Sequence, residues 1–233
     1  HRLNKMIEEV LYPAMESGTL NIVIGKGPGA RVIQLDLPPF TLIAATTRIA
    51  LLSSPLRSRF SGGTFRLDFY TTPEIEKIVK RSAQILGITL SDDAAQTIAE
   101  RSRATPRTAN YLLKRARDFA QVERGELTPK SVSEALALLE IDELGLSALD
   151  RAILETIIDK YKGGPVGLGT IAAALSEETA TIEEVNEPYL LKLGLIERTP
   201  RGRTATRRAF EHLGFDYPLP TSPTAPLGGS TAK

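Results

Sequence analysis

The feature that most constrains the fold is a change of sequence pattern near Tyr70. Before it, short β-prone runs lie between turns; after it, helical patterns follow one another without strands. Thr71, Pro73 and Glu74 are typical of a helix start, with a hydroxyl cap, an early proline and an acid in the first turn. The spacing predicts helices over residues 73–86, 91–103, 106–122 and 129–139. We therefore expect an α/β domain that ends near residue 70 and an all-α domain after it.

Composition excludes several kinds of site. The 233 residues suffice for one large domain or two to three small ones. A total of 29 Lys and Arg against 28 Asp and Glu leaves a net charge of +1, so whole-chain charge does not indicate nucleic acid. The absence of cysteine excludes disulfides and thiolate metal sites, and two histidines without metal-binding spacing predict no metal site. With neither a membrane-length apolar run nor a visible signal peptide, we expect a soluble intracellular protein.

A β-hairpin is predicted after an initial amphipathic helix. Residues 20–24 and 31–37 are short β-prone runs on either side of the glycine-rich segment 25–30. Ile22, Val23 and Ile24 are apolar in succession, more than a ribbon with one solvated face needs. Such an exposed apolar tip would mark a partner-binding surface. The alternative is that these three side chains pack on their own domain.

Residues 40–60 have a pattern that suits phosphate chemistry. The apolar run 41–45 predicts a buried strand of a parallel sheet, and Thr46, Thr47 and Arg48 follow at its carboxyl end, where open α/β sheets bind ligands. Arg57 and Arg59 come shortly afterwards, and guanidinium groups bind phosphate oxygens in a forked geometry. The alternative is a buried strand followed by two solvated arginines. Residues 64–70 predict one more strand.

A second candidate anion site lies at the start of the helix predicted over residues 106–122. Thr105 caps this helix, Pro106 opens it, and Arg107 falls in its first turn. A cation there opposes the helix dipole, and a bound phosphate would reverse that cost. The alternative is a solvated arginine balanced by a nearby carboxylate.

The last part of the chain predicts a winged-helix domain. Helices over residues 148–161, 169–175 and 181–193 precede two short strands that flank a tight turn at 199–202. Arg198, Arg201 and Arg203 gather in this hairpin, as a phosphate backbone requires. The predicted third helix is acidic, with Glu183 and Glu184, so we expect DNA-backbone contact through the wing without base readout. Residues 218–233 are rich in Pro, Ser, Thr and Gly and are predicted to be disordered.

The succession of these segments resembles the RuvB family of AAA+ ATPases. The resemblance rests on Ala45-Thr46-Thr47-Arg48, Pro55-Leu56-Arg57-Ser58-Arg59-Phe60, Thr105-Pro106-Arg107, Glu187-Pro188-Tyr189-Leu190 and the segment 198–203. It implies an α/β fragment of the large ATPase domain (residues 1–70, with the end of a parallel sheet and the hairpin), a helical lid (71–143), a winged-helix domain (144–217) and a disordered tail (218–233). Ile49-Ala50, the loop 61–64 and Ala104 depart from the family pattern.

The resemblance also implies roles for individual residues. Thr47 would be the sensor 1 residue facing the γ-phosphate, and Arg59 the arginine finger acting on the ATP of a neighbouring subunit. Arg107 would be the sensor 2 contact to the same subunit's γ-phosphate, and Tyr70 would stack on the nucleotide base. The tip Ile22, Val23 and Ile24 would dock onto RuvA, and Arg198, Arg201 and Arg203 would hold DNA.

For the whole protein, the resemblance implies a bacterial cytoplasmic motor that uses ATP and Mg²⁺. A homohexameric ring would drive Holliday junction branch migration in recombination and repair of DNA damage, a function of the SOS response, with double-stranded DNA, RuvA and RuvC as partners. The sequence contains no Gly-x-x-x-x-Gly-Lys-Ser/Thr and is expected to start just after the Walker B acids, so this chain alone should not hydrolyse ATP. Two alternatives are a non-catalytic winged-helix DNA-binding or adaptor protein and a clamp-loader-like AAA+ protein, although the basic wing does not fit the latter.

Overall fold

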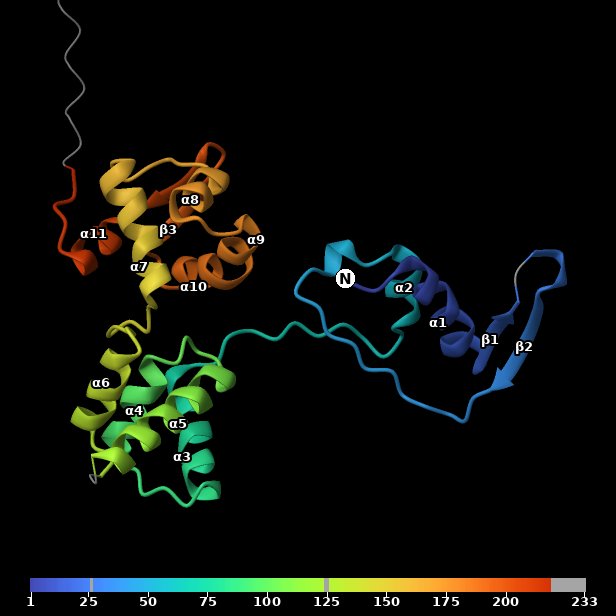
Figure 1. The fold of residues 1–233 in the computed structure, drawn as a ribbon, viewed down its shortest axis with the longest axis horizontal. Helices are drawn as coiled ribbons and strands as arrows, with labels where there is room; N and C mark the ends of the chain where they lie inside the picture. Colours follow the sequence, from blue (N-terminus) through green and yellow to red (C-terminus); the bar gives the residue numbers. More distant parts are fainter. Residues whose placement is uncertain (26, 124–125, 219–233) are drawn as a thin grey trace, which may run out of the picture. The chain divides into compact units, whose positions relative to one another are not determined.

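The computed structural model describes residues 1–25, 27–123 and 126–218, and it divides into two compact units (Figure 1). The first unit comprises His1–Asp68, and the second begins at Phe69. A membrane-spanning helix is absent from the described part of the chain, where no helix combines sufficient length with sufficient apolarity. The tail predicted to be disordered, beyond Pro218, lies outside the described residues.

The first unit is built on helix α1 (Lys5–Ser17) and an antiparallel hairpin. Asn4 caps α1 by accepting a hydrogen bond from the Met6 N–H, and Gly18 ends it in the left-handed conformation. Strands β1 (Thr19–Ile24) and β2 (Arg31–Asp36) confirm the predicted hairpin. A 3-10 turn, η1 (Gly27–Gly29), joins them; η2 (Ile49–Leu51) and helix α2 (Ser54–Arg59) complete the unit.

The strands predicted over residues 41–45 and 64–70 are not formed. Both segments are irregular and exposed, and β1 with β2 is the one strand pair in the described part of this unit. The end of a parallel sheet predicted here is therefore absent from these residues. The reason is physical: an apolar run becomes a strand only when a neighbouring strand takes up its backbone N–H and C=O groups.

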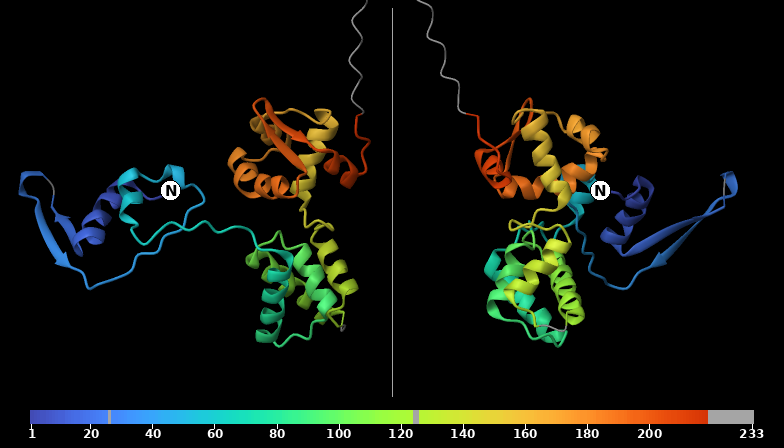
Figure 2. Two further views of the ribbon diagram at one scale, coloured as in Figure 1. Left: turned by 180° about the vertical axis from the view of Figure 1, so that it is seen from behind. Right: turned by 60° about the vertical axis from the view of Figure 1, so that its left-hand side comes forward.

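Four helices form the lid, the helical bundle of the second unit, and confirm the predicted all-α segment (Figures 1 and 2). They are α3 (Thr72–Ile85), α4 (Asp92–Glu100), α5 (Pro106–Val122) and α6 (Pro129–Leu138). Each is preceded by a hydroxyl residue at its N-cap, the feature from which the starts of α3 and α5 were predicted. Their apolar faces enclose one core, whose largest fully buried side chains are Ile75, Ile98, Leu112, Leu113 and Leu136.

The winged-helix domain follows in the same unit and has its own core, which includes Leu146, Ile153, Ile171 and Leu190. Its first helix is α7 (Ala148–Glu155), which continues as a π-helical turn, η3 (Thr156–Lys160), and its second is α8 (Leu168–Leu175). The third predicted helix consists of α9 (Thr179–Thr181), the π-helical η4 (Ile182–Asn186) and α10 (Glu187–Lys192).

The wing is the antiparallel pair β3 (Ile196–Thr199) and β4 (Gly202–Ala205), as predicted. Arg203 and Val166 exchange two backbone hydrogen bonds, of 2.8 and 2.9 Å, which fasten β4 to the segment before α8. Gly202 is required here, because a Cβ at this position would lie 2.3 Å from the Val166 carbonyl oxygen. A last helix, α11 (Arg207–Leu213), was not predicted; it packs Ala209 and Phe210 into the core.

Candidate nucleotide and DNA-contacting sites

Arg59, the predicted arginine finger, is held against α1. It is the last residue of α2, whose first turn is capped by the Ser53 hydroxyl. One guanidinium nitrogen donates to the Pro55 carbonyl at 2.7 Å, and another pairs with Glu16 at 2.7 Å. The guanidinium carbon lies 4.3 Å from the centre of the Tyr12 ring, and the side chain is 22% exposed. Arg59 is therefore an ordered cation with a carboxylate partner inside its own unit, whereas Arg57 on the same helix is exposed.

Thr47, the predicted sensor 1 residue, is exposed and makes no hydrogen bond within the described residues. Its neighbour Thr46 is engaged instead: the Thr46 hydroxyl contacts His1 Nδ1 at 2.8 Å and accepts the Arg48 N–H at 3.1 Å. The hydroxyl of Thr47 is thus free to meet an external group. Thr47 and Arg59 belong to the first unit, whereas Tyr70 and Arg107 belong to the second.

Tyr70 and Arg107 are linked through the segment that precedes α5. The Tyr70 N–H donates to the Ala104 carbonyl at 3.3 Å, and the Tyr70 ring is about half exposed. Arg107 is exposed in the first turn of α5 and has neither an ion pair nor a hydrogen bond to any described residue. This differs from the alternative of a balancing carboxylate. The lid thus presents an aromatic ring and an unpaired guanidinium from neighbouring segments.

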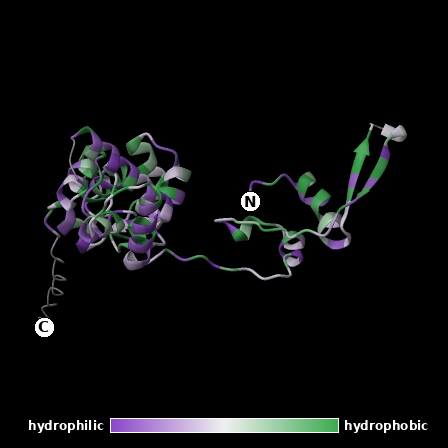
Figure 3. Cartoon of the chain, turned by 90° about the horizontal axis from the view of Figure 1, so that it is seen from below, coloured by the Kyte–Doolittle hydropathy of each residue, from purple (hydrophilic) through white to green (hydrophobic). Residues whose placement is uncertain are grey.

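The hairpin carries hydrophobic residues along both of its strands (Figure 3), and strand alternation places apolar residues on both of its faces. Ile22 pairs with Ile33 and Val23 with Val32, and successive residues of a strand point to opposite faces. Val23 is 64% exposed, and Ile22 and Ile24 are also exposed. Within the described residues these side chains do not pack into a core. Figure 2 shows the ribbon projecting beyond α1 in both views.

The three wing arginines occupy different environments. Arg198 and Arg203 both donate two hydrogen bonds to Glu187, at 2.7 and 2.9 Å from Arg198 and at 2.9 and 3.1 Å from Arg203. The Glu187 side chain is only 1% exposed, whereas that of Arg198 is 52% and that of Arg203 is 20% exposed. Arg201, at the turn between the strands, is exposed. Sequence reasoning grouped these three cations as DNA contacts and missed Glu187 as the anchor of Arg198 and Arg203.

The electrostatics of Glu187 follow from this geometry. Burial favours the neutral acid and raises the pKa of the Glu187 carboxyl, but the hydrogen bonds from Arg198 and Arg203 outweigh burial and hold the pKa below its ordinary value. The carboxylate in turn raises the pKa of Arg198. The first residue of α10 is thus an anion at neutral pH that positions the wing. Since Arg198 and Arg203 are its partners, Arg201 is the wing cation most available to an external phosphate.

The described residues suggest no metal centre, because nowhere among them do three His, Asp or Glu side chains gather closely enough to hold an ion. What they do present is a four-helix lid with an unpaired cation at a helix start, joined to a winged-helix domain with an exposed arginine at the tip of its wing. A helical lid followed by a winged helix is the order of domains that the resemblance to AAA+ ATPases leads us to expect.

The comparisons with known families identify the member of this class. Residues 1–67 match the Holliday junction DNA helicase RuvB P-loop domain, residues 70–142 the RuvB AAA lid domain, and residues 143–214 the RuvB C-terminal winged helix domain. The chain belongs to the RuvB family. The fold class predicted from the sequence is confirmed at this level, with the exception of the missing strands.

Individual relatives agree with this assignment. The Holliday junction branch migration complex subunit RuvB of Chloroflexus aggregans is 58% identical over 219 residues, which cover 94% of this chain and 62% of the relative. The protein of the same name from Dehalococcoides mccartyi is 59% identical over 218 residues, 93% of this chain and 62% of the relative. Among solved structures, the Thermotoga maritima RuvB Holliday junction branch migration motor is 47% identical with a TM-score of 0.80, covering 94% of this chain and 68% of that one. The chain therefore spans just over three fifths of these two curated relatives.

Proposed function

We propose that the complete protein is an ATP-driven DNA motor that moves Holliday junctions in bacterial recombination and repair, acting in the cytoplasm as a homohexameric ring. The observation that supports this most is the succession of three RuvB-specific domain matches, in order, over residues 1–67, 70–142 and 143–214. The 47% identity to a protein titled as a branch migration motor adds to it.

In this function Arg107 and Tyr70 would bind the nucleotide from the lid side. The guanidinium of Arg107 has no protein partner among the described residues and lies in the first turn of α5, where the helix dipole favours an anion, so the segment fits a phosphate. Bound ATP would supply the phosphoanhydride bond that drives movement. Because no acidic cluster is found in the described residues, we assign no Mg²⁺ ligand among them.

Thr47 and Arg59 would act from the first unit, Thr47 as the hydroxyl that reports on the γ-phosphate and Arg59 as the finger in trans. Arg59 is already paired with Glu16, so binding a phosphate would require it to exchange one anion for another. The stack on Tyr12 keeps the guanidinium ordered before that exchange. A preordered arginine loses less side-chain entropy when it binds.

The wing and the hairpin would contact the partners. Exposed Arg201 would bind duplex phosphates. Arg198, which is half exposed although it is paired with Glu187, would contribute to the same contact, whereas the more buried Arg203 would mainly support the wing. The apolar tip of the hairpin would dock onto RuvA, and RuvC would join the same DNA complex. A non-catalytic DNA-binding adaptor is the second candidate, because the exposed wing cation Arg201 and the exposed apolar hairpin could bind partners without a motor.

The test is a chimera in which the preceding segment of the Chloroflexus aggregans relative is joined ahead of His1. With RuvA and ATP, it should migrate a synthetic four-way junction. Arg59→Ala should lower ATP turnover by about 10³- to 10⁵-fold and leave nucleotide binding nearly intact. Arg57→Ala, on the same helix, is the matched control and should retain turnover. A chimera that binds duplex and ATP but moves no junction would favour the adaptor.

The hairpin role is tested in the same chimera. Val23→Asp would place a charge in an apolar contact, so it should remove the stimulation of migration by RuvA while basal ATP turnover persists. Asn21→Asp adds the same charge on the same face of β1 and is the control. Equal stimulation of both variants by RuvA would contradict the docking role.

A further inference from the structure

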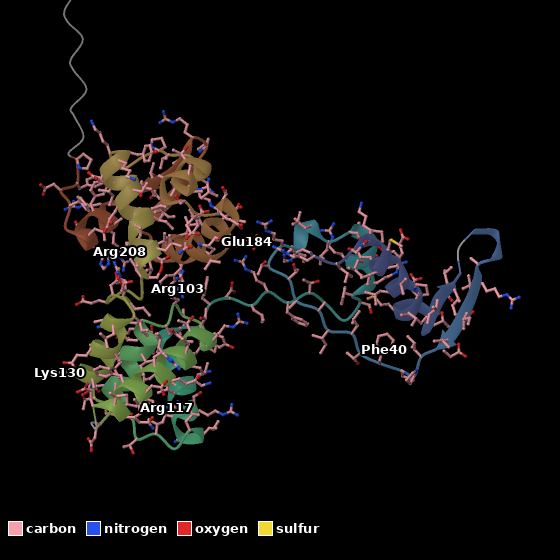
Figure 4. The ribbon with its side chains drawn as sticks, in the orientation of Figure 1. Phe40, Arg103, Arg117, Lys130, Glu184 and Arg208 are labelled. Atoms are coloured by element: carbon pink, nitrogen blue, oxygen red, sulfur yellow. The ribbon has the colours of Figure 1, made fainter. Side chains whose placement is uncertain are left out.

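Arg103, a residue that the sequence analysis assigned no role, joins the lid to the winged-helix domain (Figure 4). One guanidinium nitrogen donates to Asp150 at 3.0 Å and another to the Val185 carbonyl at 2.9 Å. The guanidinium carbon lies 4.8 Å from the centre of the Tyr189 ring. A single lid side chain thus contacts the first helix of the winged-helix domain and two segments of its third.

The acceptor Asp150 is prepared by its own domain. It is fully buried, and its carboxylate accepts hydrogen bonds from the Ser147 N–H at 2.9 Å, the Ser147 hydroxyl at 2.7 Å and the Asn186 amide at 2.8 Å. These bonds come from the start of α7 and the end of η4, so they orient the carboxylate independently of Arg103. A buried, charge-assisted pair with its remaining acceptor sites filled has a narrow geometry.

The backbone around Arg103 is equally constrained. Arg103 and Ala104 both adopt left-handed conformations, with φ of 56° and 55°, which non-glycine residues seldom do. Gly145, in the join to the winged helix, approaches so closely that a Cβ there would lie 2.6 Å from the Arg101 carbonyl oxygen. Strain of this kind persists only where surrounding contacts hold it.

The entrance to the lid is tied to the same place. The Lys192 ammonium lies 4.6 Å from the centre of the Phe69 ring, so α10 contacts the residue before Tyr70. Tyr70 in turn donates its N–H to Ala104. Residues 69–70, residues 101–104 and the third helix of the winged-helix domain therefore meet around one arginine.

We infer that Arg103 is a positioning residue that fastens the segment carrying Arg107 to the winged-helix domain, so that lid and winged helix turn as one body. The consequence for the motor rests on the proposed function. A phosphate that binds Arg107 would move the start of α5, and the Arg103–Asp150 ion pair would transmit that movement to the winged-helix domain. Only three residues separate Arg103 from Arg107. The coupling therefore needs no long pathway through the lid core.

The test measures the connection directly in the full chain, without nucleotide or DNA, so it can fail independently of the proposed function. Because the chain has no cysteine, Lys77→Cys on α3 and Ala173→Cys on α8, both exposed, give two unique spin-label positions. Pulsed electron resonance should give one narrow distance distribution for the labelled parent. Arg103→Ala should broaden it at least twofold in width, and Arg103→Gln should also broaden it, since a glutamine is too short to span both acceptors.

Lys114→Ala, which removes an exposed cation of the same lid, is the matched control and should leave the parent distribution unchanged. Circular dichroism should show that the variants retain their helices, and Arg103→Gln provides the result if Arg103→Ala does not fold. Parent-like width in a folded Arg103 variant, a broad distribution in the parent itself, or equal broadening by Lys114→Ala would each overturn the inference.

Discussion

Glu187 shows how much a single buried carboxylate can determine. It receives four hydrogen bonds from Arg198 and Arg203, which come from the two strands of the wing. Glu187→Gln should destabilise the winged-helix domain by about 2 kcal/mol at neutral pH, less than a fully buried pair would cost, because the arginines can rehydrate. Urea titration followed by the amide NMR signals of the winged-helix domain measures this.

The pH dependence supplies a second arm of that prediction. Since the folded pKa of Glu187 lies below its unfolded value, its stabilisation is complete above the unfolded pKa and is lost as pH falls through the folded pKa. The stability difference between parent and Glu187→Gln should therefore shrink steadily in acid. Glu197→Gln, an exposed change on β3, should cost nothing at any pH. A deficit for Glu187→Gln that stays constant down to the acid end of the titration would contradict this assignment.

At the scale of elements, the wing separates a contact role from a support role. Arg201→Ala should reduce the slope of log K against log salt for duplex binding by about 0.9 and leave the stability of the domain unchanged, because Arg201 has no internal partner among the described residues. Arg203→Ala should weaken both binding and stability, because it also removes a partner of Glu187. Fluorescence anisotropy at several salt concentrations gives the slopes.

Lys130 is an exposed cation of the lid, distant in sequence from the wing. Lys130→Ala therefore controls for the loss of one positive charge and should leave the salt slope unchanged. An Arg201→Ala slope equal to that of the parent would exclude Arg201 from phosphate contact. Affinity lost on one duplex sequence only would point to base readout instead.

Elements differed in how well the sequence predicted them. Helices of the lid were predicted within a few residues because Thr71, Ser91, Thr105 and Thr128 mark their starts locally. The prediction of strands at 41–45 and 64–70 was wrong, because a strand needs a neighbouring strand to pair with, and an apolar run does not show whether one is present. The helix α11 was not predicted from the sequence. Two of its residues have partners within the domain: Arg208 donates to the Leu193 carbonyl, and Arg207 pairs with Glu211.

At the scale of the whole chain, the two units have cores of very different size. Among the described residues of the first unit, Ala14 and Leu56 are the buried apolar side chains, whereas the second unit has two extensive cores. Amides of α1, β1 and β2 should therefore exchange with deuterium roughly a hundredfold faster than those of α5. Hydrogen exchange with mass spectrometry compares them in one sample. Equal protection in both units would show that the first is stabilised by contacts that its thin core does not reveal.

The candidate sites were predicted as residues but not as arrangements. The family resemblance pointed to Thr47, Arg59, Tyr70 and Arg107, and these assignments stay predictions. Nothing in the sequence indicated that Arg59 would be paired with Glu16, or that Arg103 would reach across to Asp150, 47 positions away. Such pairs depend on tertiary packing, which local patterns do not encode.

The hairpin of the first unit has a practical consequence for anyone handling this chain. A ribbon of two strands leaves both outer edges with unpaired backbone groups, and here Val23, Val32 and Ile33 are exposed beside them. Unprotected edges with apolar flanks are templates for strand-to-strand stacking between molecules. Concentrated solutions of the protein should therefore aggregate through this hairpin. The rate of aggregation should depend more on what covers the two strand edges than on the stability of the lid and winged-helix cores.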